Sequence, residues 1–255
     1  MARILEFIDS LIPLQDPDLQ APKLEKFLSH RPLEDTVNAL NEMILKAIEG
    51  NEKARLVLNP FLLTKTLTEL MDYEKRREIY EAATAKNLPI VKALLSDPIP
   101  FEKGPKIDSI RILDIRPKKT IGNPNLRRDP ITLGERRSLA KSKDRKILEK
   151  ILYDPDPKVI QNLLNNRSIL ETDILKLASH RPNQGPILNL LGCHRRWGKN
   201  PRIRQALVLN PYTPPLLAVV TLVTADQQLL KEVRHDENLH PLLREVTQKI
   251  LELKK

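Results

Sequence analysis

The chain has 255 residues, of which 40% are hydrophobic and 30% are charged, with a formal net charge of +10. This balance is typical of a globular protein of one or two domains and excludes a disordered chain. The single cysteine, Cys193, excludes an internal disulfide and a cysteine-based metal cluster. With only 7 Gly but 21 Pro, the composition favours many short helices over an all-β fold, because Pro fits the first helical turn.

The N-terminal run from Met1 to Asp9 contains Glu6 and Asp9 among its apolar residues, so we expect no signal peptide there. The longest apolar stretch in the chain, Pro214 to Val223, has 10 residues. A membrane-spanning helix needs about 20. We therefore expect a cytoplasmic protein with no membrane partner.

Charge is distributed unevenly along the chain. Residues 1–102 contain 13 Lys and Arg against 17 Asp and Glu, whereas residues 103–150 contain 15 against 6 and residues 151–255 contain 15 against 10. An acidic N-terminal part is thus followed by a basic middle. Such asymmetry can mark a site for an anionic partner, or a solvated basic connector that lies against the acidic part.

Several segments recur in the chain. Ser29 to Pro32 (SHRP) recurs as Ser179 to Pro182, and Leu56 to Pro60 (LVLNP) recurs as Leu207 to Pro211. With a single-residue shift these matches align residues 22–96 with 172–247, which predicts an internal duplication. A shorter echo relates Val159 to Asn166 with Ile203 to Asn210. The predicted repeat is an apolar helix, an Asn or Asp, a Pro-containing turn and a second helix.

The turns of this unit carry helix-start signals. Asp156 and Pro157 predict a cap and a first residue for a helix that continues over 158–164, and Thr213 and Pro214 predict the same for the helix after them. A further helix is predicted over 171–178, where apolar residues recur at helical spacing. Helices this short are marginal alone and must stack on neighbours, as in a solenoid.

The Asn-Pro-x-Thr-Pro and Asp-Pro-Asp-Pro-x-Val turns, each followed by a Leu-rich helix, resemble those of leucine-rich-repeat-variant and HEAT-like helical repeat proteins. The likeness is best over residues 145–250 and weaker over 50–98. It implies an all-α fold, an α-solenoid of short helices. Some leucine-rich-repeat-variant proteins hold an iron–sulfur cluster on a Cys-rich segment, which Cys193 alone does not provide. The segment from Leu133 to Ala140 is also similar to one in a bacterial family with no assigned activity.

Three regions are predicted: an N-terminal helical repeat half over residues 1–97, a connector over 98–134 and a C-terminal helical repeat half over 135–255. The connector contains six Pro and three Gly, and Pro at this density keeps the preceding residues extended. Connectors of this length are usually functional or disordered. We expect an extended, basic segment that docks at least partly through its Ile and Leu residues.

The first candidate surface for an anionic partner follows the connector. It comprises the cations of the segment from Leu133 to Lys150, namely Arg136, Arg137, Lys141, Lys143, Arg145, Lys146 and Lys150. These side chains would face phosphates. The alternative is that they form the solvated face of an amphipathic helix.

The second candidate surface joins the only Trp of the chain to a basic cluster. Its members are Arg195, Arg196, Trp197, Lys199, Arg202 and Arg204. Arg and Trp together could hold phosphate and stack a base. The alternative is a loop between two helices, with Trp197 packed against a repeat and the Arg side chains solvated.

Other polar residues have structural explanations. His30 and His180 occupy matched positions, where a His, an Arg and a Pro suit the end of a helix. Asp154 and Asp156 resemble a carboxylate pair, but capping accounts for them. No Gly-rich phosphate loop or nucleophile motif is present in the sequence. We therefore expect no catalytic residue, cofactor or metal ligand.

Three functions remain open. The first is a non-enzymatic scaffold or adaptor that binds a protein partner, and the second is a nucleic-acid-binding helical repeat protein that uses the two basic segments. The third is an enzyme, by analogy with bacterial alkylpurine DNA glycosylases built on HEAT-like repeats. That likeness is architectural only, and fold analogy is a weak indication of function. We expect the first.

Overall fold

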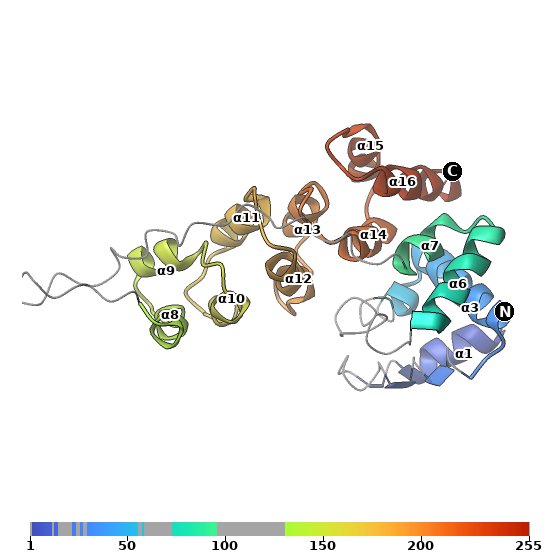
Figure 1. The fold of residues 1–255 in the computed structure, drawn as a ribbon, viewed down its shortest axis with the longest axis horizontal. Helices are drawn as coiled ribbons and strands as arrows, with labels where there is room; N and C mark the ends of the chain where they lie inside the picture. Colours follow the sequence, from blue (N-terminus) through green and yellow to red (C-terminus); the bar gives the residue numbers. More distant parts are fainter. Residues whose placement is uncertain are drawn as a thin grey trace, which may run out of the picture. The chain divides into compact units, whose positions relative to one another are not determined.

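A computed structural model describes residues 2–11, 13–14, 22–23, 26–27, 30–55, 58, 73–95 and 131–254. All regular elements within these ranges are α-helices, which confirms the predicted all-α class (Figure 1). They are α1 (Ala2–Leu11), α3 (Leu33–Ile48), α6 (Tyr73–Ala85), α7 (Pro89–Leu95), α8 (Leu133–Leu139), α9 (Arg145–Ile151), α10 (Pro157–Leu164), α11 (Glu171–Ser179), α12 (Gly185–Cys193), α13 (Pro201–Val208), α14 (Pro215–Val223), α15 (Gln227–His235) and α16 (Pro241–Leu253).

The chain divides into two compact units. Unit 1 comprises residues 1–100 and 213–255, and unit 2 comprises residues 101–212. This grouping divides the predicted C-terminal half, 135–255, after Tyr212, because the last three helices pack with the N-terminal ones. The predicted connector lies outside the described residues apart from 131–134, and its last two residues already belong to α8.

Unit 1 is built around α3 and α7. Helix α3 packs against α6, α7 and α14, while α7 also packs against α14 and α16. The predicted duplication aligns Ile79 in the hairpin α6–α7 with Leu230 in the hairpin α15–α16. Both side chains are fully buried. The core of unit 1 therefore joins helices from both ends of the chain.

The described part of unit 2 consists of α8 to α13, in which contacts join consecutive helices (α8 with α9, α12 with α13) and helices two positions apart. Helix α10 packs against α8 and α12, and α11 packs against α13. In Figure 1, α8, α10 and α12 form one row, and α9, α11 and α13 form the other. Between them lies a core of Leu, Ile and Val that includes Leu148, Ile160, Leu163, Ile174, Leu188 and Ile203. Burial of these side chains stabilises helices of seven to nine residues that would not persist alone.

Side-chain caps mark the start of α8, α9, α10 and α13. Asp156 caps α10 by accepting a hydrogen bond from the backbone N–H of Lys158, with Pro157 as the first helical residue, as predicted. The predicted start of α14 is wrong by one residue, since Pro214 is its cap and Pro215 its first residue. The reason is that Pro214 precedes another proline, which holds it in an extended conformation, with ψ at 133°. His180 ends α11, as predicted.

Asn166, just after α10, ties the end of that helix to the end of α8. Its Nδ2 donates hydrogen bonds to the carbonyl oxygens of Ala140 and Ser142, at 2.9 and 2.7 Å. Its Oδ1 accepts from the backbone N–H of Ser168 at 2.8 Å. One amide therefore satisfies two carbonyls that the end of a helix leaves without intrahelical donors.

Asn210, just after α13, makes the same set of contacts with the end of α11. Its Nδ2 donates to the carbonyl oxygens of Ala178 and His180, at 2.7 and 3.0 Å, and its Oδ1 accepts from the N–H of Tyr212. The sequence echo that aligns Asn166 with Asn210 thus coincides with one hydrogen-bonding pattern made twice.

We expect Asn210→Ala to lower the free energy of unfolding of unit 2 by about 2 kcal/mol, because it leaves two carbonyls and one N–H without partners in a buried position. Urea unfolding followed by the fluorescence of Trp197 reports on unit 2, since that residue is the only Trp of the chain. Asn189→Ala, at an exposed position on α12, is the control and should change stability little. Equal stabilities for the two variants would contradict the role of Asn210.

Candidate functional site

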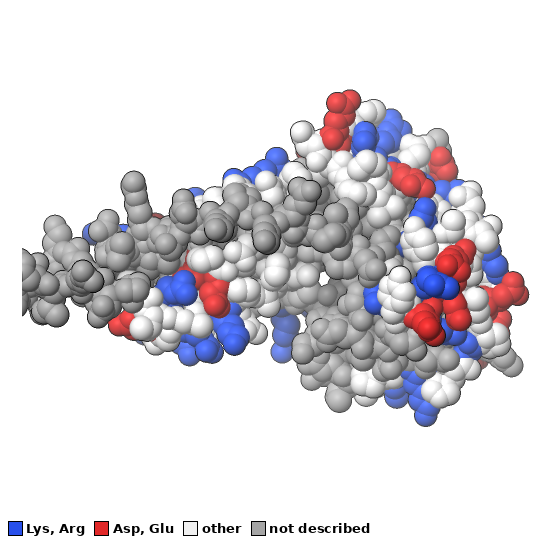
Figure 2. Space-filling view, in the orientation of Figure 1, with Lys and Arg blue, Asp and Glu red and all other residues white. Residues whose placement is uncertain are grey.

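The described part of unit 2, residues 131–212, carries a strong positive charge. It contains sixteen Lys and Arg against seven Asp and Glu, and from Ile174 to Tyr212 it contains no Asp or Glu at all. Where grey atoms do not cover α8 to α13 in Figure 2, more blue Lys and Arg atoms than red Asp and Glu atoms are visible. This run without carboxylates indicates a local concentration of positive charge, which the charge totals of longer segments did not reveal.

The thirteen predicted contact residues all lie in unit 2. Arg136 and Arg137 belong to α8, Lys141 and Lys143 to the turn after it, Arg145, Lys146 and Lys150 to α9, Arg195 to Lys199 to the α12–α13 loop, and Arg202 and Arg204 to α13. Nine of the twelve cations are exposed, whereas Arg136, Arg145 and Arg204 are half-buried.

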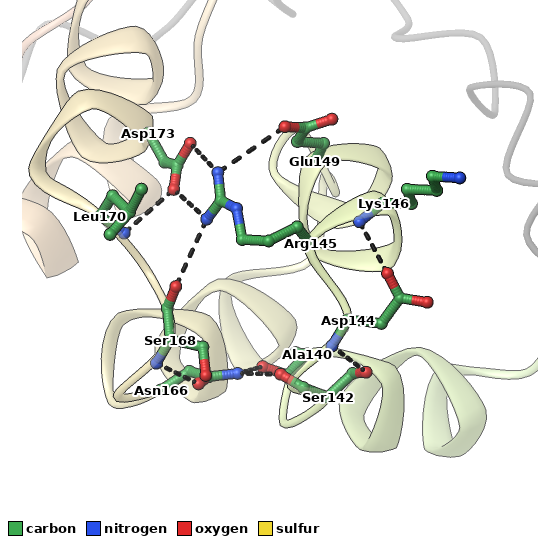
Figure 3. Close-up of polar contacts among 10 residues, drawn as sticks. All are labelled: Ala140, Ser142, Asp144, Arg145, Lys146, Glu149, Asn166, Ser168, Leu170 and Asp173. Carbon is green, nitrogen blue, oxygen red and sulfur yellow. Dashed lines mark hydrogen bonds and ion pairs between the residues drawn. The ribbon is translucent and has the colours of Figure 1, made fainter.

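Arg145 at the start of α9 is joined to Asp173 in α11. Its Nη1 and Nη2 donate to the two carboxylate oxygens at 2.7 and 2.9 Å, and Nη1 also donates to the carbonyl of Ser168 at 3.3 Å (Figure 3). The N–H of Leu170 donates to the same carboxylate at 3.0 Å. The hydrogen bond from Arg145 is the main reason why the pKa of Asp173 lies below its ordinary value. In Figure 3 the amine of Lys146 points away from this network.

Arg136 in α8 is engaged with Asp154 in the turn before α10. Its Nη1 lies 3.0 Å from both carboxylate oxygens, and the N–H of Asp156 donates to the same carboxylate at 2.9 Å. The Asp154 side chain is fully buried, and burial raises its pKa despite the opposing effect of Arg136. Arg136 and Arg145 thus hold helices together, which leaves fewer of their donors for a partner.

Trp197 lies in the core and not on the surface. Its side chain is 3% exposed, and its indole Nε1 donates to the carbonyl of Leu164 at the end of α10, at 3.0 Å. The guanidinium of Arg196 lies over the ring, 4.0 Å from its centroid. The predicted stacking of a base on Trp197 therefore has no exposed ring face available, and the packing alternative describes this residue.

His194 shapes the start of the α12–α13 loop. Its Nδ1 accepts hydrogen bonds from the backbone N–H groups of Arg196 and Trp197, at 3.3 and 3.4 Å, and its Nε2 lies 3.3 Å from Oδ1 of Asn165. This pattern fits a neutral ring with its proton on Nε2. Burial, with a smaller contribution from Arg196, lowers the pKa of His194 and favours the same neutral form.

The described residues offer little for nucleophilic catalysis or metal binding. Burial raises the pKa of the Cys193 thiol to about 12, so it stays protonated and is a poor nucleophile. No cluster of three or more His, Cys, Asp or Glu side chains that would hold a metal ion occurs in the ranges that the structure describes. Across the same ranges, every helix is too short or too polar to span a bilayer.

Comparisons of the chain with protein-family models, with curated proteins and with solved structures found no match.

Asp173→Asn should lower the free energy of unfolding of unit 2 by about 2 kcal/mol at pH 7, because it removes a charge-assisted hydrogen bond to a buried carboxylate. The pKa of Asp173 is lowered in the folded state, so its stabilisation is complete above the ordinary pKa of 3.8 and is lost as the pH falls through the lowered value. The difference between wild type and variant should therefore shrink in acid.

Urea unfolding at about pH 7, 5 and 3, followed by Trp197 fluorescence, measures this difference. Glu149→Gln is the matched control, since Glu149 is exposed and lies 3.7 Å from the same Arg145. Its effect should be about 0.5 kcal/mol or less. A wild-type advantage over Asp173→Asn that is unchanged in acid would show that the charge of Asp173 does not contribute.

Proposed function

We propose that the chain is a non-enzymatic helical repeat scaffold that binds a protein partner. In this proposal unit 2 is a short α-solenoid of the HEAT-like or leucine-rich-repeat-variant type. The observation that carries it is the pair of equivalent ties made by Asn166 and Asn210, each of which joins the end of one helix to the end of the helix two positions earlier. Contacts that recur between neighbours are typical of solenoids.

A framework of this kind suits the presentation of a surface. The cross-helix bonds of Arg145 and Trp197 add to those of Asn166 and Asn210, so that the ends of most helices in unit 2 are tied to another helix. Nine exposed cations of the predicted surfaces remain on this framework. Rigid presentation of side chains reduces the entropy that is lost on binding and therefore favours a binding role.

The binding role is tested by affinity capture with the full chain from a nuclease-treated lysate of its own cells. We expect the same proteins to be retained in near-stoichiometric amounts by wild type and by Asn189→Ala, but not by the double variant Asn166→Ala/Asn210→Ala, because a protein partner recognises the intact framework. If no protein depended on the two Asn residues, the scaffold proposal would be wrong.

Nucleic acid binding is the second candidate. The excess of sixteen cations over seven carboxylates in the described part of unit 2 favours it. The burial of Trp197 argues against base stacking, so any binding would rest on phosphate contacts.

Gel-shift assays with duplex DNA and single-stranded RNA test this candidate. Phosphate-dominated binding should weaken by about a thousandfold or more between 50 and 200 mM salt for six or more contacts. Trp197→Phe should leave it unchanged, because the ring does not face a base. The absence of a shift at the lower salt concentration would remove this candidate.

A further inference from the structure

The C-terminal ends of α8, α10 and α12 converge in unit 2. Nδ2 of Asn162 donates to the carbonyl of Arg137 at 3.3 Å, which brings the middle of α10 to the end of α8. Asn165, which follows α10, meets the ring of His194, which follows α12. The indole of Trp197 reaches the last residue of α10. Together with the tie from Asn166, these bonds place the three helix ends in one row.

Six exposed cations come from these three helix ends. We name them the C-terminal ridge: Arg137 and Lys141 at the end of α8, Arg167 after α10, and Arg195, Arg196 and Lys199 after α12. Within the described part of the chain, none of the six lies in an ion pair.

Carboxylates are absent from the segments that form the ridge. Residues 136–143, 157–170 and 185–200 contain no Asp or Glu. Four carboxylates flank these segments and engage other groups. Asp144 and Asp156 cap α9 and α10, Glu135 completes the capping box of α8, and Glu171 lies 3.8 Å from Arg202. Among the described residues, the ridge is thus a line of positive charge without a carboxylate paired to it.

Hydrogen-bonding capacity distinguishes between anionic partners. Cations complement the negative ends of helix dipoles, which explains why they are tolerated here. Phosphates and carboxylates alike favour helix N-termini, so helix polarity does not separate the two. A DNA backbone offers acceptors only, whereas a peptide offers carboxylates to the cations and N–H donors to nearby carbonyls and amide oxygens.

We propose that the C-terminal ridge docks an acidic segment of a protein partner, rich in Asp and Glu. This inference rests on the proposed function and specifies the chemistry of the partner. The buried ring of Trp197 offers no face on which a base could stack, which disfavours nucleic acid at this place. Charge complementarity over six cations is the basis of recognition.

The probe is labelled poly-L-glutamate of about 20 residues, and its binding to the full chain is measured by fluorescence anisotropy at about 0.1 M salt. The triple variant Lys141→Gln/Arg167→Gln/Lys199→Gln removes one cation from each helix end. It should weaken binding about tenfold or more, as expected for three exposed charge contacts.

The matched control is Lys150→Gln/Lys158→Gln/Lys176→Gln, which removes the same charge from exposed positions of unit 2 outside the ridge. It should weaken binding less than about threefold, because only the long-range field changes. Urea unfolding of both triple variants should match that of wild type, which separates loss of binding from loss of helix stability.

Three results would overturn the ridge as an acidic docking surface. They are equal weakening by the two triple variants, no binding of poly-L-glutamate, or tighter binding of a duplex DNA with the same number of charges. If a lysate protein is still captured through the intact framework, the scaffold proposal survives and only its acidic docking surface is lost.

Discussion

The helices of unit 2 depend on one another because none is long enough to persist alone. Each has seven to nine residues, well below the length at which isolated helices become stable in water. Their apolar faces are buried against neighbouring helices and, for α8 and α10 to α13, also against helices two positions away. The backbone carbonyls at the helix ends also need hydrogen-bond donors. Asn166, Asn210 and Trp197 supply these donors from a different helix end. Apolar packing and these hydrogen bonds at the helix ends together determine how the helices of unit 2 are arranged.

The same constraint sorts the cations into two groups. Arg136 and Arg145 lie between helices and are bound to buried carboxylates, so they belong to the framework. The cations of the C-terminal ridge lie at helix ends, where no described carboxylate neutralises them. In the sequence these two groups look alike, because both are Lys and Arg residues near the starts and ends of short helices.

Local signals in the sequence predicted much of the fold. The pair Asp156–Pro157 predicted the start of α10, and apolar spacing predicted α11 to within one residue. At α14 the sequence predicts the first of two prolines, Pro214, as the helix start, but the proline after it forces that residue out of the helical region. The division into units could not be predicted, since it depends on the packing of α14 and α16 against α7, between segments more than a hundred residues apart.

Prediction of the candidate surface was less complete. The basic segments were visible as sequence, but the partners of Arg145 and Arg136 lie 28 and 18 residues away, beyond the reach of local patterns. For Trp197 the sequence leaves base stacking and packing against a repeat both open, because composition carries no information about burial. Trp197 follows a turn in which Nδ1 of His194 accepts hydrogen bonds from two backbone N–H groups. The burial of its ring is a tertiary feature that local sequence does not reveal.

The order of the units along the chain has a consequence for biosynthesis. Along the chain, unit 2 lies between the two parts of unit 1, so that α14 to α16 are translated after α3, α7 and all of unit 2. Helices α3 and α7 therefore emerge from the ribosome long before the helices that complete their core. Unit 2, whose contacts join helices close in sequence, can fold before α14 to α16 have been synthesised. During that interval the faces of α3 and α7 that pack against α14 and α16 lack their final cover, which exposes apolar surface on the nascent chain.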